Sequence, residues 1–104
     1  MLLNKIKENV ELLAAFPLGI AQAYCKKAQE AASKALVAAN EPESLEYIYN
    51  MFDLREKIRS AMLFCSSEPI VHNSEVIYPL ELLKNADEQI ENLFSESQQA
   101  DNNN

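Results

Sequence analysis

The sequence predicts an all-α fold, a small bundle of three or four helices, and three observations support this. Alanine, leucine, glutamate, lysine and glutamine dominate the composition, and these residues favour helices. Apolar residues recur at steps of three and four along most of the chain, which is the period of an amphipathic helix. The chain has a single glycine, whereas a sheet-rich fold needs several tight turns with positive φ.

The first forty residues are expected to form a helix, a break and a second helix. The apolar stripe of residues 2–16 predicts the first helix. Pro17 cannot donate a backbone hydrogen bond, so a break or a sharp kink is expected at Phe16–Gly19. Because proline fits the first turn of a helix, the second helix is expected from about Pro17 to Ala39. The pattern leaves open whether residues 1–39 form two helices or one kinked helix.

Alanine occupies most of the inward-facing positions predicted for the second helix. Small side chains let helix axes approach closely. This seam is therefore expected to pack tightly against a helix of the same chain, or to take a second copy or a partner helix. The inward candidates are Ala21, Ala28, Ala31, Ala32, Ala35 and Ala39, with Ile20, Tyr24 and Leu36 as larger anchors.

A third helix is expected from about Pro42 to Cys65, with a length of roughly 35 Å at about 1.5 Å per residue. Four charged residues near its middle are expected to form an exposed face, and these are Arg55, Glu56, Lys57 and Arg59. The core stripe expected for this helix contains Leu45, Ile48, Tyr49, Phe52, Ile58, Met62 and Cys65.

A fourth helix is expected to begin at Pro79. Residues 1–97 are expected to form a single domain, and residues 98–104 a disordered polar tail, because "QQADNNN" offers nothing to bury. The carboxylates of the helix, Asp87, Glu88 and Glu91, are expected on a solvated face. Its apolar side contains Leu83, Ala86 (or Asp87), Ile90, Leu93 and Phe94, widened at the start by Leu80 and Leu82.

Residues 68–79, "EPIVHNSEVIYP", interrupt the helical pattern before this last helix. One interpretation of residues 70–78 is a very short β-hairpin, with strands Ile70–Val71 and Val76–Tyr78 around a four-residue turn, which would need the helices for stability. The other, which we favour, is an irregular connection whose apolar residues plug the end of the core. Helices in bundles are usually joined by about two to eight residues, so partner contact is a hypothesis for this longer connection.

No residue pattern in the chain predicts catalysis or a bound cofactor. A zinc site needs about four closely spaced ligands, and the thiols and imidazole of this chain are limited to Cys25, Cys65 and His72. The Glu-x-x-His pattern of di-iron bundles is absent, and one glycine cannot build a phosphate-binding loop. We therefore expect no enzyme, no catalytic residue, no cofactor and no metal.

The net charge of −7 is concentrated in the second part of the chain. Residues 1–40 hold five lysines and three glutamates, whereas residues 41–104 hold thirteen acidic and four basic residues. A nucleic-acid binder needs a basic face, so we expect no nucleic-acid partner. No apolar run reaches the ~18 residues of a membrane span and no signal peptide opens the chain, so we expect a cytoplasmic protein with reduced thiols. Peripheral lipid contact through the helix that holds Lys5 and Lys7 stays open.

These observations favour a non-enzymatic interaction protein that binds a protein partner, itself, or both through apolar helix faces. Two long helices in so short a chain favour a homodimer, because a long helix buries poorly against only a few neighbours. The predicted partner-binding residues are Ile20, Tyr24, Ala28, Ala31, Ala35, Ile70, Val71, Val76, Ile77 and Tyr78.

Two other functions remain as alternatives. The first is an acidic inhibitor or nucleic-acid mimic, whose residues 41–56 and 81–101 would occupy a basic groove of a target protein. The second is a ligand-binding bundle, which would need a pocket walled by Tyr24, Tyr47, Tyr49 and Phe52.

Overall fold

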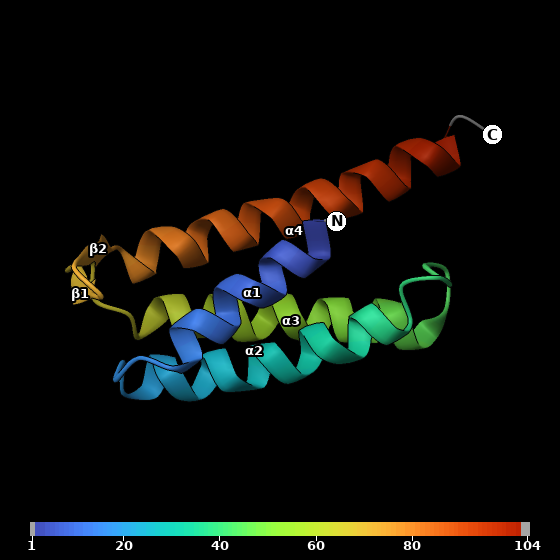
Figure 1. Ribbon diagram of the computed structural model, residues 1–104. Coiled ribbons are helices and arrows are strands. Elements are labelled where there is room, and N and C mark those ends of the chain that lie inside the picture. Colours follow the sequence, from blue (N-terminus) through green and yellow to red (C-terminus); the bar gives the residue numbers. More distant parts are fainter. Residues whose placement is uncertain (1, 103–104) are drawn as a thin grey trace.

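Over residues 2–102 the chain folds into four helices and one short hairpin (Figure 1). A computed structural model describes the backbone of residues 2–102 and the side chains of residues 2–95. The predicted all-α bundle with a hairpin-like connection before the last helix is confirmed. In chain order the elements are α1 (Leu2–Ala14), α2 (Ile20–Val37), α3 (Leu45–Leu63), β1 (Ile70–His72), β2 (Glu75–Ile77) and α4 (Pro79–Asn102).

The helices α2 and α3 run antiparallel and form the largest interface of the bundle (Figure 1). The helix α1 packs on α2, and α4 closes the bundle by contacting both α1 and α3. One buried cluster joins all four helices. Its largest fully buried side chains include Leu3, Ile6 and Leu13 of α1, Met51, Leu54 and Ile58 of α3, and Leu83 and Ile90 of α4.

The break between α1 and α2 separates two distinct helices, and α2 begins at Ile20 rather than near Pro17 as predicted. Gly19 explains the later start, because its φ of 62° lies in the left-handed region, where a right-handed helix cannot continue. The side-chain amide of Gln22 donates a hydrogen bond to the Ala14 carbonyl over 2.9 Å. This bond ties the end of α1 to the start of α2.

The alanine seam of α2 lies inside the monomer. Ala21, Ala28, Ala31, Ala32 and Ala35 are all buried, where α2 faces α1 and α3. The sixth predicted alanine, Ala39, is half-buried against the core. The predicted anchors are also less buried: Tyr24 and Leu36 are half-buried, and Ile20 is 57% exposed. The small side chains therefore serve the packing of α2 within its own chain.

The helix α3 begins three residues later than predicted, at Leu45 instead of Pro42. Ser44 is its N-cap, and the Ser44 hydroxyl accepts a hydrogen bond from the backbone N–H of Tyr47 over 3.2 Å. This cap satisfies one of the free N–H groups at the helix start, which fixes the boundary. The helix ends at Leu63, so Cys65 lies beyond it.

Residues 70–78 form a hairpin, so the irregular connection that the sequence analysis favoured is wrong. The turn has two residues rather than the predicted four, and β1 and β2 include His72 and Glu75. Asn73 and Ser74 have φ values of 51° and 66°. A tight two-residue turn needs positive φ at both positions, a conformation that asparagine adopts readily and serine rarely, which is why the sequence pattern concealed it.

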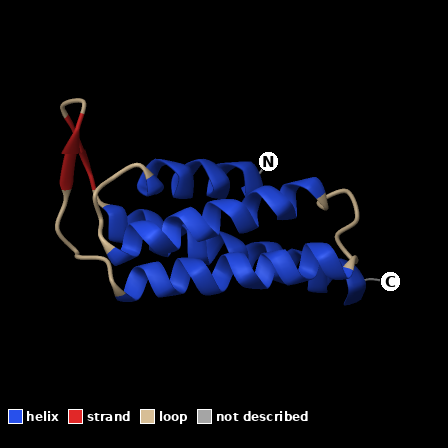
Figure 2. Ribbon diagram, turned by 90° about the horizontal axis from the view of Figure 1, so that it is seen from below, coloured by secondary structure: helices blue, strands red, loops and turns tan. Residues whose placement is uncertain are grey.

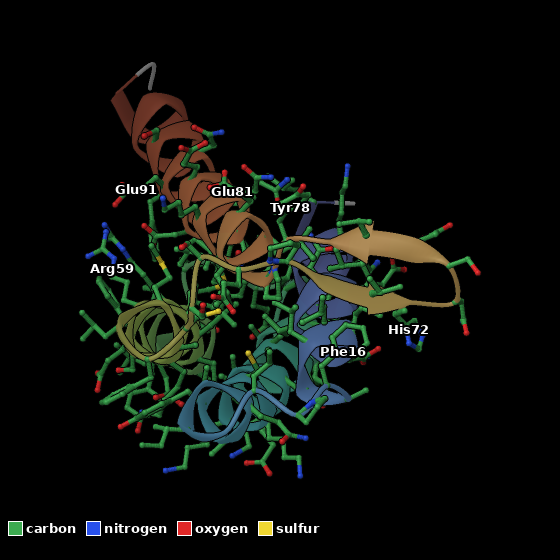
Figure 3. All side chains as sticks on the ribbon, turned by 90° about the vertical axis from the view of Figure 1, so that its left-hand side faces the viewer. Phe16, Arg59, His72, Tyr78, Glu81 and Glu91 are labelled. Atoms are coloured by element: carbon green, nitrogen blue, oxygen red, sulfur yellow. The ribbon has the colours of Figure 1, made fainter. Side chains whose placement is uncertain are left out.

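The hairpin stands at one end of the bundle (Figure 2), and side chains of one of its faces contact the bundle. The register pairs Ile70 with Ile77, and both side chains are half-buried against the core. The His72 ring meets the Phe16 ring edge-on, with centroids 4.9 Å apart (Figure 3). These contacts supply the support that an isolated two-stranded hairpin lacks.

The last segment of the chain leaves one expectation untested. The backbone of α4 is helical as far as Asn102, whereas the sequence predicted a disordered tail over residues 98–104. The side chains from residue 96 onward and all of residues 103–104 lie outside the described part of the chain. The division into a 1–97 domain and a tail therefore stays a prediction.

We predict that Ser74→Gly stabilises the protein. Glycine adopts positive φ without a steric penalty, so the free energy of unfolding should rise by about 0.5–1 kcal/mol. Urea unfolding followed by circular dichroism measures this change. Ser67→Gly is the matched control, because Ser67 is an exposed loop serine without positive φ, and there stability should stay unchanged or fall slightly. Equal effects of the two changes would contradict the prediction.

Candidate interaction surface

Apolar side chains line the side of α3 that faces away from the core. Leu45 is 85% exposed, Tyr49 is 69% exposed and Phe52 is 57% exposed. Ile48, one turn before Phe52, is exposed as well. Single exposed apolar residues are common on proteins, but several on one helix face indicate a contact surface.

The geometry of α3 explains why these residues stay outside. Met51, Leu54 and Ile58 are fully buried and define the inner side of the helix. At about 100° per residue, Leu45 and Phe52 fall on the opposite side. The helix therefore carries apolar side chains on both sides.

The predicted core stripe of α3 is wrong in its first half. Leu45, Ile48, Tyr49 and Phe52 were expected inside, and the structure exposes them. The predicted stripe combined residues from two opposite sides of the helix. The positions that actually face inward there are Tyr47, Asn50, Met51 and Leu54, and buried Asn50 donates its side-chain amide to the Glu46 carbonyl over 2.8 Å.

An aromatic pair extends this surface onto α4. The Phe52 ring stacks on the Phe94 ring, with centroids 5.3 Å apart and planes at 28°. The guanidinium of Arg55 lies 6.0 Å from the centre of the Phe94 ring. Aromatic stacking holds Phe52 in place instead of leaving it to rotate freely. We call Leu45, Ile48, Tyr49, Phe52 and Phe94 the α3 outer face.

Two arginines of α3 bind two carboxylates of α4 beside the outer face. Asp87 accepts a hydrogen bond from Arg59 Nε over 3.0 Å and lies 3.9 Å from Arg55 Nε. Glu91 binds both Arg55 and Arg59, the latter over 3.3 Å. Figure 3 shows Arg59 and Glu91 on the side of the bundle away from the hairpin. Of the charged residues predicted to be exposed on these two helices, Glu56, Arg59 and Glu88 are exposed, whereas Arg55, Lys57, Asp87 and Glu91 are half-buried. The two arginines, Asp87 and Glu91 also join α3 to α4, which the sequence analysis did not predict.

The ten residues predicted to bind a partner fall into two groups in the structure. Ala28, Ala31 and Ala35 are buried in the core, Ile70 and Ile77 are half-buried against it, and Tyr24 stacks on Phe64 with ring centroids 5.9 Å apart. None of the ten belongs to the α3 outer face, and whether any contacts a partner stays a prediction. The exposed members are Ile20, Val71, Val76 and Tyr78.

The hairpin carries a second exposed apolar surface. Val71 and Val76 are paired across the strands and point away from the face that holds Ile70 and Ile77. Tyr78 directly follows β2, two residues after Val76, and is 51% exposed. We call these three residues the hairpin outer face. The hairpin projects on the side of the bundle away from α3 (Figure 3).

The chemically reactive side chains of the described residues form no metal-binding group, although the two thiols lie near enough for Cys65 to affect the pKa of Cys25. Cys25 is buried in α2, Cys65 is half-buried after α3, and both are free thiols. His72 contacts Phe16 and Asn73. Among the residues that the structure describes, no three histidine, cysteine, aspartate or glutamate side chains are grouped to hold a metal ion.

An open hollow lies between α1 and α2 and is lined by mixed polar residues and alanines. The residues that line this hollow are Glu11, Ala14, Ala15, Lys26, Gln29, Glu30, Ser33 and Lys34. None of the four aromatic residues that were expected to wall a pocket is among them.

Within the described part of the chain, no helix combines the length and the apolar character that crossing a membrane requires.

Comparison with known proteins adds no relative. No protein-family model matches the chain, and no curated protein or solved structure is significantly similar to it.

We predict that Asp87→Asn weakens the junction of α3 and α4. The change removes one of the two carboxylate charges that both arginines share, so that Glu91 alone is left to balance Arg55 and Arg59. The free energy of unfolding should fall by about 1 kcal/mol in low salt and by less in high salt. Glu88→Gln is the control, because Glu88 is exposed and bound to neither arginine. An equally small loss in both variants would contradict a structural role for the network.

We predict that the two thiols differ in reactivity. Burial, and then the nearby charge of Cys65, raise the pKa of Cys25 from 9.0 to about 11. Partial burial also raises the pKa of Cys65. At about pH 8, iodoacetamide should alkylate Cys65 first and Cys25 only after unfolding, as mass spectrometry of timed samples would show.

The raised pKa of Cys25 also has a consequence for stability. The folded protein holds the thiol proton more tightly than the unfolded chain does. This stabilisation is complete below pH 9.0 and is lost as the pH rises towards about 11. Cys25→Ala should flatten the fall of stability in that range, and an unchanged pH profile would contradict the assignment.

Proposed function

We propose that this chain is a non-enzymatic interaction protein whose α3 outer face binds a partner protein. The observation that carries the proposal is the exposure of Leu45, Tyr49 and Phe52 on the side of α3 opposite the core. Burying such side chains contributes about 25 cal/mol for each Å² of apolar surface removed from water. A partner that covers them would gain this free energy, and aromatic anchors are typical of the centre of a binding interface.

The arrangement of α3 favours a helix as the binding element. Leu45, Tyr49 and Phe52 are spaced i, i+4 and i+7, so they form a straight row of roughly 10 Å along the helix. A row of this kind fits between the side chains of a second helix packed alongside. The Phe52–Phe94 stack holds the end of the row in one position, which lowers the entropy lost on binding.

A homodimer is the second candidate, and the hairpin outer face supports it. Val71, Val76 and Tyr78 are uncharged and exposed, so two copies could meet there without opposing like charges. A two-fold dimer uses the same surface on both subunits, which suits an uncharged apolar face. We also propose a cytoplasmic location, because two cysteines are too few for the disulfide framework of a small secreted protein.

The acidic-mimic alternative has less support from the charge arrangement. Asp87 and Glu91 lie in the segment 81–101 expected to fill a basic groove, and both are already bound by arginines. A target protein would have to compete with Arg55 and Arg59 for them.

The test compares two double variants that serve as controls for each other. Leu45→Asp/Phe52→Asp disrupts the α3 outer face, and Val71→Asp/Val76→Asp disrupts the hairpin outer face; all four residues are exposed, so both variants should keep the helical circular dichroism spectrum. The measurements are the molar mass in solution by light scattering and the proteins captured by each tagged variant from the native host.

We expect the α3 variant to lose the captured partner and keep the molar mass of the unsubstituted protein. If a dimer forms, the hairpin variant should keep the captured partner and fall to the molar mass of a monomer. Capture of the same partner by the folded α3 variant would overturn the proposed function. A monomeric mass for the unsubstituted protein at high concentration would overturn the homodimer.

A further inference from the structure

The carboxylates around the α3 outer face have few partners. Glu41, Glu43 and Glu46 are exposed near the start of α3, and none forms an ion pair among the described residues. Glu56, one turn after Phe52, lies on the outer side of α3; its side chain is 74% exposed and lies 3.7 Å from Lys57 Nζ, a lysine that it shares with Asp53. The positive end of the helix dipole explains an acidic residue at Glu46, in the first turn, but not one at Glu56.

The nearby cations, by contrast, are already bound by carboxylates. Lys57 Nζ lies 3.0 Å from Asp53, and this hydrogen bond is the main reason that the pKa of Lys57 is raised. Arg55 and Arg59 bind Asp87 and Glu91 of α4. The apolar row is therefore bordered by a surplus of negative charge. At an ionic strength of about 0.1 M, the electrostatic potential of these charges decays over about 10 Å in solvent.

We propose that the α3 outer face takes a basic amphipathic helix of a partner protein, an inference that rests on the proposed function of this face. The partner helix presents apolar side chains at i, i+3 or i+4, and i+7 to Leu45, Tyr49 and Phe52. Lysine or arginine side chains beside them reach the carboxylates of Glu43, Glu46 and Glu56. Such charge complementarity speeds association and selects the partner.

The same charges disfavour the other occupants of this face. Nucleic acids and anionic lipid surfaces are negative, so they are repelled. A second copy docked by two-fold symmetry would set the carboxylates of one subunit near those of the other. Only a cationic partner gains from both the apolar row and its border.

The experiment uses the full chain and two synthetic helical peptides of about 18 residues, or five turns. Both peptides share one leucine face; one carries lysine on the remaining positions and the other glutamate. Binding is measured by fluorescence anisotropy, and the contact site by changes in amide NMR shifts. We expect the lysine peptide to bind with shift changes centred on Leu45, Tyr49 and Phe52, and the glutamate peptide to bind on the order of tenfold more weakly or not at all.

Two charge-reversal triples separate local from general attraction. Glu43→Lys/Glu46→Lys/Glu56→Lys changes the border of the face, and Glu8→Lys/Glu30→Lys/Glu75→Lys makes the same change of net charge at exposed sites elsewhere. The first triple should weaken the binding of the lysine peptide on the order of tenfold and strengthen the binding of the glutamate peptide. The second triple should change the binding of either peptide little. If the first triple unfolds, the corresponding Glu→Gln triple gives the same test with a smaller loss.

Equal weakening by both triples, or shift changes away from α3, would overturn the partner class. The proposed function has a separate readout. If the first triple keeps its captured partner while Leu45→Asp/Phe52→Asp loses it, the face binds a partner without this charge preference. If both keep it, the proposed function itself fails.

Discussion

The close packing of α2 against its neighbours is the constraint on which the rest of the structure depends. Ala28, Ala31, Ala32 and Ala35 leave little side-chain volume between α2 and the helices beside it, so α3 can lie close along the length of α2. That contact fixes the rotation of α3, because its larger side chains must fill the remaining space. Met51, Leu54 and Ile58 take this role, and Leu45 and Phe52 are consequently turned to the outside. The candidate binding surface is thus a consequence of core packing.

Electrostatics then determines which charges this surface offers. The ion pairs of Arg55 and Arg59 with Asp87 and Glu91 join α4 to α3. The bound carboxylates also balance the positive charge of both arginines. Lys57 is held by Asp53 in the same way. The carboxylates at the start of α3 have no such partners, so a chain with mixed charges presents a surface of one sign. The packing of α4 on α3 therefore determines both which charges are paired within the molecule and which carboxylates stay unpaired on its surface.

The hairpin solves a connection problem and creates a second surface. The chain connects the end of α3 to the start of α4 through two short strands, β1 and β2. A two-residue turn at Asn73 and Ser74 joins these strands. The alternation of a strand turns Ile70 and Ile77 to the bundle and Val71 and Val76 to solvent. The two apolar surfaces lie on different sides of the molecule, so occupation of one leaves the other accessible (Figure 3).

The sequence by itself determined the helices, their approximate limits, the break before Gly19 and the inward alanines of α2, because period, proline and glycine act locally. It also limited the reactive side chains to two cysteines and one histidine that no motif connects. Only the tertiary structure decided which side of α3 is buried, because α3 has apolar residues on two sides and its periodicity fits the burial of either one. The arginine–carboxylate network was likewise beyond the sequence, because each arginine lies 28 or more residues from the carboxylates that it binds and meets them only when α4 packs on α3. The surface that a partner would recognise is therefore decided by packing between helices, which local sequence patterns do not encode.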